Sequence, residues 1–145
     1  MIPENPLCPN TDKDAKQIDL LLTGLRVLVV DDDEDSRFYI STVLEGDGAR
    51  VTAVASAAEA LSLLPQFQPN VLICDIAMPD EDGYSLIRKV RELTAEEGGL
   101  VPAVALTAYA EREERERALA AGFQNHVAKP VDPEVLVRVV ADLLS

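Results

Sequence analysis

The sequence predicts a doubly wound α/β fold, with a five-stranded parallel sheet and helices on both faces. Five short apolar runs rich in β-branched residues alternate along the chain with five segments of helical periodicity, and such alternation is typical of a parallel sheet. Most of these runs are continuously apolar, as in strands buried on both faces. We expect the strands at 26–30, 50–55, 70–74, 102–106 and 126–129.

The first two helices are predicted from apolar stripes that follow capping residues. Asp35 is the expected N-cap of the first helix, which ends near Gly46. Ser56 and Glu59 have the spacing of a capping box that opens the second helix. Pro65 should end this second helix, because proline cannot continue its backbone hydrogen bonding.

The fourth and fifth helices differ sharply in character. The fourth, at about 111–121, contains the charged run EREERER, in which Glu111–Arg115 and Glu113–Arg117 have a stabilising spacing. Because its apolar face is so thin, we expect it to be loosely docked. That face consists of Ala118, Leu119 and Ala121. The last helix should begin at Asp132 as N-cap, with Pro133 in the first helical position.

Length and charge limit the classes of partner. A chain of 145 residues suits one domain. We divide it into an N-terminal extension at 1–24, flexible or one short helix, and a folded domain at 25–145. The net charge of −13 and the pI near 4.3 argue against nucleic acid and anionic membranes as direct partners.

The sequence shows no targeting or membrane segment. The N-terminus lacks the basic and apolar regions of a signal peptide, and the apolar runs are too short to span a bilayer. Cys8 and Cys74 form neither a disulfide framework nor a metal-ligand pattern. These features predict a cytoplasmic protein.

Polar side chains follow or end four of the predicted strands. Asp31 and Asp32 come after the first strand, Asp75 after the third and Thr107 after the fourth, and Lys129 ends the fifth. Right-handed crossovers place the carboxyl ends of all the strands at one edge of the sheet, where the ligands of such folds bind. We therefore expect these side chains to meet in one crevice.

The chemistry of this crevice points to a cation and a phosphoryl group. Three neighbouring carboxylates would raise one another's pKa unless a cation lay among them. Oxygen ligands without His or Cys suit Mg²⁺, which also shares phosphate oxygens. One carboxylate can itself attack phosphorus and form an acyl phosphate, while Lys129 and Thr107 balance the charge on the phosphoryl oxygens.

At these residues the chain resembles the receiver domain of two-component response regulators. The matching segments are VLVVDDD (27–33), LICDIAMPDEDG (72–83), ALTA (105–108) and AKP (128–130). They occur in order and at similar spacing, so the resemblance covers the chain from about residue 25 to its end. It implies a flavodoxin-like sheet with strand order 2-1-3-4-5.

The resemblance also implies roles for individual residues. Asp75 would be the phosphoacceptor. Asp32 would bind Mg²⁺ directly and Asp31 mainly through water, with Asp75 and the backbone carbonyl of Ala77 as further ligands.

Three more roles come from the same resemblance. Thr107 would hydrogen-bond the phosphoryl group and move as a switch residue, and Lys129 would pair with that group. The Lys129–Pro130 peptide bond would be cis. His126 stands where the family commonly has a switching Phe or Tyr, and we favour a similar role for its ring over a pH-sensitive one.

The implied function is signalling by phosphotransfer. A histidine kinase or histidine phosphotransfer protein would supply the phosphoryl group, and the protein would catalyse only its own aspartyl phosphorylation and dephosphorylation. No output segment follows the last helix, so we expect a switched surface to bind a downstream protein. We expect a monomer or weak homodimer. Similar receivers also end hybrid kinases, so the chain could be part of one.

Three other protein classes fit the sequence less well. An aspartate-nucleophile phosphohydrolase would use Asp31-x-Asp33, but it usually has a longer chain, and Asp75 would then have no role. A Ca²⁺ loop over Asp31, Asp33 and Asp35 has Ser36 where glycine is required. A purely structural domain would not need the complete set of expected active-site side chains.

Overall fold

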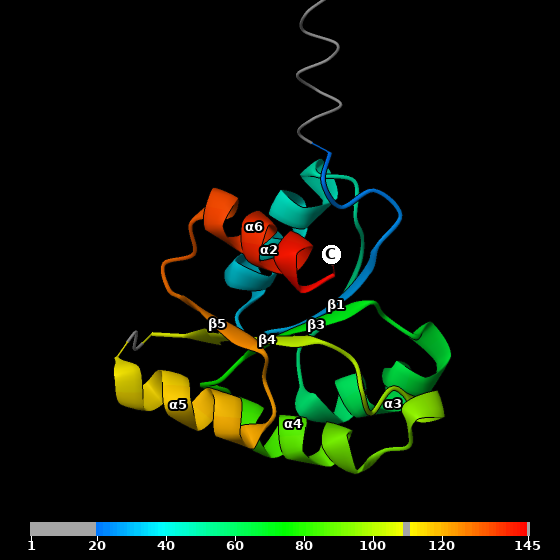
Figure 1. Cartoon of the computed structure of the whole chain (residues 1–145), viewed down its shortest axis with the longest axis vertical. Helices are drawn as coiled ribbons and strands as arrows, with labels where there is room; N and C mark the ends of the chain where they lie inside the picture. Colours follow the sequence, from blue (N-terminus) through cyan, green and yellow to red (C-terminus); the bar gives the residue numbers. More distant parts are fainter. Residues whose placement is uncertain (1–19, 109–110, 145) are drawn as a thin grey trace, which may run out of the picture.

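The computed structural model describes residues 20–108 and 111–144, and it has the predicted α/β fold. Five parallel strands lie in the order β2-β1-β3-β4-β5, as the resemblance implied. Helices α2 and α6 cover one face of the sheet, and α3, α4 and α5 cover the other (Figure 1). The strands are β1 (Arg26–Val30), β2 (Arg50–Val54), β3 (Val71–Asp75), β4 (Ala103–Thr107) and β5 (Asn125–Ala128). The helices are α2 (Glu34–Gly46), α3 (Ala57–Phe67), α4 (Gly83–Glu92), α5 (Arg112–Ala121) and α6 (Pro133–Leu143), with a short 3-10 helix, η1 (Ala95–Glu97).

The burial of each strand follows its place in the sheet. Every residue of β3 and β4 is buried, whereas β2, at one edge, has no fully buried residue. Continuous apolar runs fit strands that have neighbours on both sides and helices on both faces. Because all four strand pairs are parallel, the carboxyl ends of the strands share one edge of the sheet.

Two apolar cores hold the helix layers to the sheet. Successive side chains of a strand point to opposite faces, so Val27 and Val29 pack in the core with α2 and α6. Leu28 and Val30 pack in the other core, with α3 and α4. The sheet is thus packed on both faces.

The start of α2 differs from the prediction. The N-cap is Asp33 and not Asp35, and Glu34 and Asp35 form part of the first turn. The backbone N–H of Asp33 donates to Asp31 Oδ1 at 3.0 Å, so the carboxylate of Asp31 holds the turn that leads into the helix. Asp33 itself makes no side-chain capping bond.

The end of α3 also differs, whereas two other helix starts agree with the sequence. Pro65 lies inside the last turn of α3, which continues to Phe67. The proline removes only the bond that its own missing N–H would have made, and the N–H of Gln68 still reaches the carbonyl of Leu64. Ser56 caps α3, as predicted. Asp132 caps α6, with a proline at its start.

Helix α5 is held to α4 mainly by polar contacts. Only Ala118 of α5 is buried, and Leu119, which we expected to face inward, is 44% exposed. The hydroxyl of Tyr84, a buried residue of α4, donates to Glu114. The guanidinium of Arg117 lies 4.2 Å from the centroid of the Tyr84 ring. The buried apolar face of α5 is therefore even smaller than the sequence predicted.

The ion pairs expected along α5 are absent from the part of the chain that the structure describes. Neither Glu111–Arg115 nor Glu113–Arg117 forms an ion pair there. Arg117 stacks on an aromatic ring instead, because a ring face attracts a cation that would otherwise stay in water.

The packed part of the chain begins before β1. Leu22 is fully buried, and its backbone N–H bonds the carbonyl of Asp47 at 3.0 Å. The division at residue 24 stays a prediction, because residues 1–19, with Cys8, lie outside the described ranges. Within those ranges, no helix is both long and apolar enough to cross a membrane.

Candidate functional site

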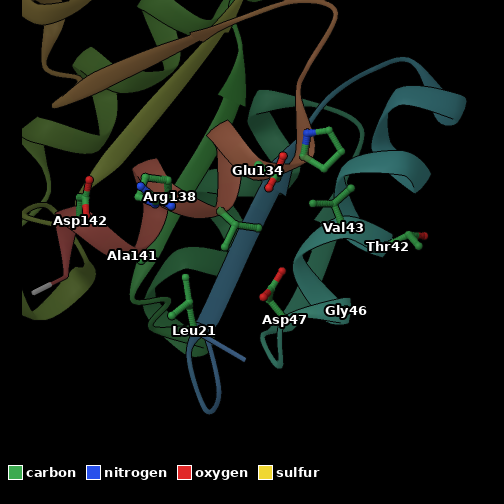
Figure 2. Close-up of a pocket in the computed structure, with 11 residues that line it drawn as sticks. Leu21, Thr42, Val43, Gly46, Asp47, Glu134, Arg138, Ala141 and Asp142 are labelled. Atoms are coloured by element: carbon green, nitrogen blue, oxygen red, sulfur yellow. The ribbon is translucent and has the colours of Figure 1, made fainter. Parts of the chain in front are cut away.

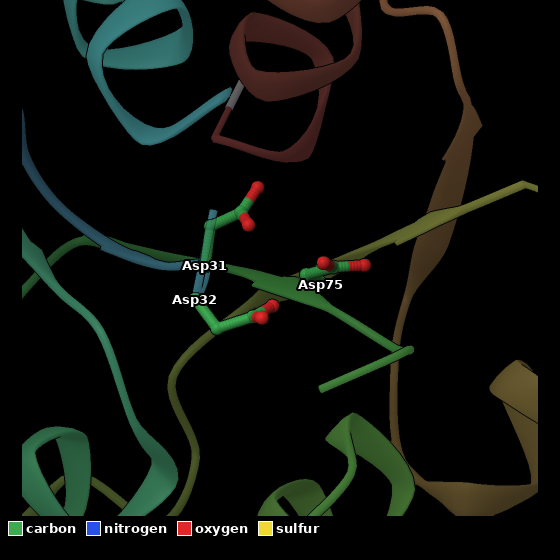
Figure 3. A group of neighbouring side chains, drawn as sticks. All are labelled: Asp31, Asp32 and Asp75. Atoms are coloured by element: carbon green, nitrogen blue, oxygen red, sulfur yellow. The ribbon is translucent and has the colours of Figure 1, made fainter. Parts of the chain in front are cut away.

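Three carboxylates meet at the carboxyl edge of the sheet. Asp31 and Asp32 directly follow β1, and Asp75 is the last residue of the neighbouring β3. One oxygen atom of each carboxylate lies within 4.8 Å of the others. Figure 3 shows the three side chains at the ends of these strands. Asp31 is fully buried and Asp75 is 4% exposed, whereas Asp32 is exposed.

Asp31 is held from several directions. Ser36, in the first turn of α2, donates its hydroxyl to Asp31 Oδ2 at 2.7 Å. Arg37 donates from Nη1 to the backbone carbonyl of Asp31 at 2.8 Å. Together with the bond from the Asp33 N–H to Oδ1, these contacts fix a buried charge that would otherwise be costly.

Lys129 supplies the positive charge of the site. Its Nζ atom lies 3.1 Å from Asp75 Oδ2 and 3.6 Å from Asp31 Oδ2. Burial alone lowers the pKa of Lys129, but the two carboxylates outweigh burial and hold its pKa above the ordinary value. The ammonium group therefore stays charged at neutral pH.

Asp75 lies in a tightly packed setting. Burial raises the pKa of Asp75, and Lys129 only partly opposes that shift. The backbone N–H of Ala77 donates to Asp75 Oδ1 at 3.3 Å. Gly83 closes the following loop, and a Cβ atom there would lie 2.7 Å from the backbone oxygen of Asp75. The charged carboxylate is thus incompletely compensated, which favours a further cation beside it.

The fourth and fifth strands contribute the remaining predicted groups. Thr107 ends β4 and is 5% exposed. Its backbone carbonyl accepts from the N–H of Lys129 at 2.8 Å, which ties the two positions together. The Lys129–Pro130 peptide bond is cis, as the resemblance implied.

His126 lies on β5, two strands away from β3 and Asp75. Its neighbour Val127 packs in the core with α6, so the alternation of the strand turns His126 toward the α5 side. The ring is half-buried, and its Nδ1 is shielded from solvent without a hydrogen-bond partner among the described residues. Burial, followed by the charge of Arg115, lowers the pKa of His126, which keeps the ring neutral at neutral pH.

The donor atoms of the site fit Mg²⁺. The three carboxylates offer only oxygen, and no His or Cys ligand belongs to the group found among the described residues. Hard oxygen ligands suit Mg²⁺, which usually binds one or two carboxylates and keeps several waters. The exposure of Asp32 leaves one side of the group open to those waters and to a phosphate oxygen.

The sequence did not reveal the role of Ser36. The sequence indicated only that a serine lies near the start of the helix that follows the acidic run. The bond to Asp31 depends on the direction of the Ser36 side chain, which points back toward the start of the helix as helical side chains do.

A cavity lies away from this site. It has a volume of about 910 Å³ and lies between α2 and α6 (Figure 2). Leu21, Val43, Val137 and Ala141 contribute apolar parts of its lining, and none of the three carboxylates lines it. The three clustered carboxylates thus lie at the open sheet edge and not in this cavity.

Comparison with known proteins agrees with this geometry. The family model described as response regulator receiver domain matches residues 27–141. An uncharacterized 14.6 kDa protein of Leptolyngbya boryana is 50% identical over 119 residues, which cover 82% of this chain and 89% of that protein. Protein PetR of Rhodobacter capsulatus is 40% identical over 118 residues, covering 81% of this chain and 48% of PetR. The chain thus spans about half of PetR, and it spans 13% of the sensor histidine kinase RcsC of Salmonella typhimurium.

Solved structures show the same fold. A putative response regulator from Chloroflexus aurantiacus has a TM-score of 0.77 and 34% identity, over 83% of this chain and 97% of that one. The receiver domain of the sensor histidine kinase PA1611 from Pseudomonas aeruginosa has a TM-score of 0.74 and 33% identity, over the same shares. That structure holds a magnesium ion in its active site cleft. With the matched motifs, the strand order and the aspartate cluster, these relatives show that the chain belongs to the response regulator receiver domain family of two-component signalling.

Proposed function

We propose that this receiver domain accepts a phosphoryl group on Asp75 with Mg²⁺ in the site. Receiver domains are phosphoacceptor signalling domains and not enzymes of the usual kind, and they interact with histidine kinases and phosphotransfer proteins. The observation that carries the proposal is the position of Asp75, buried beside two other carboxylates and 3.1 Å from a lysine ammonium.

The transfer step follows from the groups present. An oxygen of Asp75 attacks the phosphorus of a phosphohistidine, an O–P bond forms, and the P–N bond breaks. The electron pair of that bond leaves with the imidazole of the donor. Lys129 lies close enough to pair with the incoming phosphoryl oxygens, and Thr107, at the end of the next strand, supplies a hydroxyl.

The metal would be held by the carboxylates and one carbonyl. Asp32 and Asp75 would bind it directly, Asp31 through water, and Ala77 through its backbone oxygen. When bound, Mg²⁺ supplies positive charge to the phosphoryl oxygens. The protein would in this way catalyse its own phosphorylation and dephosphorylation.

The response to phosphorylation would run through α5. Thr107 lies at the end of β4, shortly before this helix, and only one residue of α5 is buried. Movement of Thr107 toward the phosphoryl group would shift α5 and let the His126 ring occupy the space. The surface of α5, β5 and α6 would then bind a downstream protein differently. We place this signalling in the cytoplasm and expect a monomer or weak homodimer.

The proposal is tested by phosphorylation with a small donor. Purified protein is incubated with acetyl phosphate, with Mg²⁺ or with EDTA, and its intact mass is measured. One phosphoryl group should be added with Mg²⁺ and none with EDTA. Equal phosphorylation under both conditions would contradict the metal-dependent chemistry, and no phosphorylation at any Mg²⁺ concentration would contradict the proposed function.

A further inference from the structure

We propose that Ser36 is a positioning residue that orients the Asp31 carboxylate and thereby sets the affinity of the site for Mg²⁺. This inference deepens the proposed function and rests on it. It starts from the burial of Asp31, which is fully enclosed. A buried carboxylate is fixed by whatever donors surround it, so these donors decide which way its oxygens face.

Each oxygen of Asp31 has a defined protein partner. Oδ1 accepts the backbone N–H of Asp33 at 3.0 Å. Oδ2 accepts the hydroxyl of Ser36 at 2.7 Å, and Lys129 Nζ lies 3.6 Å from the same atom. The lysine distance is too long for a hydrogen bond. Of the Asp33 N–H, the Ser36 hydroxyl and the Lys129 ammonium group, only the Ser36 hydroxyl makes a hydrogen bond to Oδ2.

The contact opposes the pull of Lys129. The ammonium group lies between Asp75 and Asp31, and it attracts both carboxylates. Without the Ser36 hydroxyl, Oδ2 of Asp31 can rotate toward Lys129 and shorten that ion pair. The rotation would pair Asp31 more closely with the ammonium group and change how its oxygen atoms face the other two carboxylates, so the cation would lose a well-placed carboxylate.

The rest of Asp31 is anchored independently of Ser36. Its backbone N–H bonds the carbonyl of Val54 at 3.1 Å, and its own carbonyl accepts from Arg37 at 2.8 Å. Loss of the serine hydroxyl should thus leave the backbone in place and release only the carboxylate. Hydrogen-bonding partners of metal ligands commonly change affinity in this way, by about 10- to 100-fold.

The same helix offers a matched control. Ser41 lies five residues further along α2, and its buried hydroxyl has no hydrogen-bond partner among the described residues. Ser41→Ala removes the same atom from the same helix without touching Asp31. A second pair, Ser36→Thr and Ser36→Val, compares two side chains of nearly equal shape that differ in the hydroxyl.

The test is Mg²⁺ binding to the unphosphorylated protein, measured by isothermal titration calorimetry, with thermal melts in EDTA to verify folding. Ser36→Ala and Ser36→Val should weaken Mg²⁺ binding by about tenfold. Ser36→Thr and Ser41→Ala should bind like the wild type. If Ser36→Ala does not fold, the threonine and valine variants still decide the question.

Several results would overturn the inference while leaving the proposed function intact. The first is a wild-type affinity for Mg²⁺ in both Ser36→Ala and Ser36→Val. The second is an affinity that falls equally in Ser36→Thr and Ser36→Val. The third is an affinity that falls as much in Ser41→Ala as in Ser36→Ala. Failure of the wild-type protein to bind Mg²⁺ would instead contradict the proposed function itself.

Discussion

The ammonium group of Lys129, which follows β5, lies 3.1 Å from the carboxylate of Asp75 at the end of β3, with β4 between the two strands. The candidate phosphoacceptor therefore has a positive partner before any phosphoryl group arrives. The buried carboxylate still has a raised pKa, so one lysine does not fully compensate its charge. This incomplete compensation supports the proposal that the site takes up a further cation and a phosphoryl group.

Replacing Lys129 should slow phosphotransfer. We expect Lys129→Met to lower the rate of phosphorylation by acetyl phosphate by about a hundredfold, because one preorganised donor to the phosphoryl oxygens is lost. Lys89→Met is the matched control, since Lys89 pairs with Glu81 on the surface and is half exposed. Rates come from intact mass at increasing times, and a Lys129→Met rate equal to that of Lys89→Met would count against the proposed role.

Removing Asp32 should abolish Mg²⁺ binding and at the same time make the metal-free fold more stable. Asp32→Ala should abolish Mg²⁺ binding and phosphorylation, because it removes the exposed ligand of the cluster. In EDTA the same change should raise the free energy of unfolding by about 1 kcal/mol, the Coulomb energy of two unit charges at such a distance in water. The expected rise in Tm is roughly 3 °C.

Asp35→Ala is the control for this experiment. Asp35 belongs to the same acidic run but lies in the first turn of α2, outside the cluster. It should bind Mg²⁺ normally and gain no stability, because a negative charge is favourable near a helix N-terminus. Normal phosphorylation of Asp32→Ala at low Mg²⁺ would contradict the assignment of Asp32 as a ligand.

Loss of the Tyr84 hydroxyl should loosen α5. Tyr84→Phe removes the bond to Glu114 and should cost about 1 kcal/mol of local stability. Amides of Arg112–Ala121 should then exchange about fivefold faster in hydrogen exchange measured by mass spectrometry. Tyr39→Phe removes a hydroxyl that bonds the carbonyl of Val131, and it should leave α5 unchanged. Equal exchange in all three proteins would show that the Tyr84 hydroxyl does not hold this helix.

The same contact predicts a pH dependence at high pH. Burial, followed by the Glu114 carboxylate, raises the pKa of Tyr84 to about 12. A pKa raised by folding contributes stability that is present below the unfolded pKa near 10 and lost as the pH rises through about 12. The stability difference between wild type and Tyr84→Phe should therefore shrink over this range in denaturant titrations. A difference that stays constant would contradict the assigned hydrogen bond.

The proposed switch predicts where backbone protection changes. With beryllofluoride as a phosphoryl mimic, the largest change in hydrogen exchange should fall within 107–128. It should disappear in Thr107→Ala, which lacks the hydroxyl that would move toward the mimic. Changes confined to 31–35 and 75–83 would show that the site binds the mimic without moving α5.

The sheet and the polar edge could be predicted because both depend on the order of residues along the chain. Apolar runs of β-branched residues form the buried strands, and parallel strands bring their carboxyl ends together. Asp31, Asp75 and Lys129 were therefore expected at one edge of the sheet, and the strand order that brings them close was implied by the resemblance. In the structure the ammonium group of Lys129 lies within ion-pair distance of the carboxylates of both Asp31 and Asp75.

The contacts of Ser36 and Tyr84 could not be predicted in this way. The Ser36–Asp31 bond depends on one side-chain rotamer and on the exact start of α2, which begins earlier than the sequence indicated. The link from Tyr84 to Glu114 depends on how two helices pack side by side. The spacing along α5 suggested Glu113 as the partner of Arg117, whereas in the structure Arg117 packs on the ring of Tyr84.

The identity of the phosphoacceptor is the central claim, and one comparison tests it most directly. Wild type, Asp75→Asn and Asp80→Asn are incubated with acetyl phosphate and Mg²⁺, and their intact masses are measured. Asp80 is a suitable control because it is exposed and has a positive φ of 68°, which asparagine also tolerates. Wild type and Asp80→Asn should each gain one phosphoryl group, and Asp75→Asn should gain none. Equal phosphorylation of Asp75→Asn and wild type would contradict the claim.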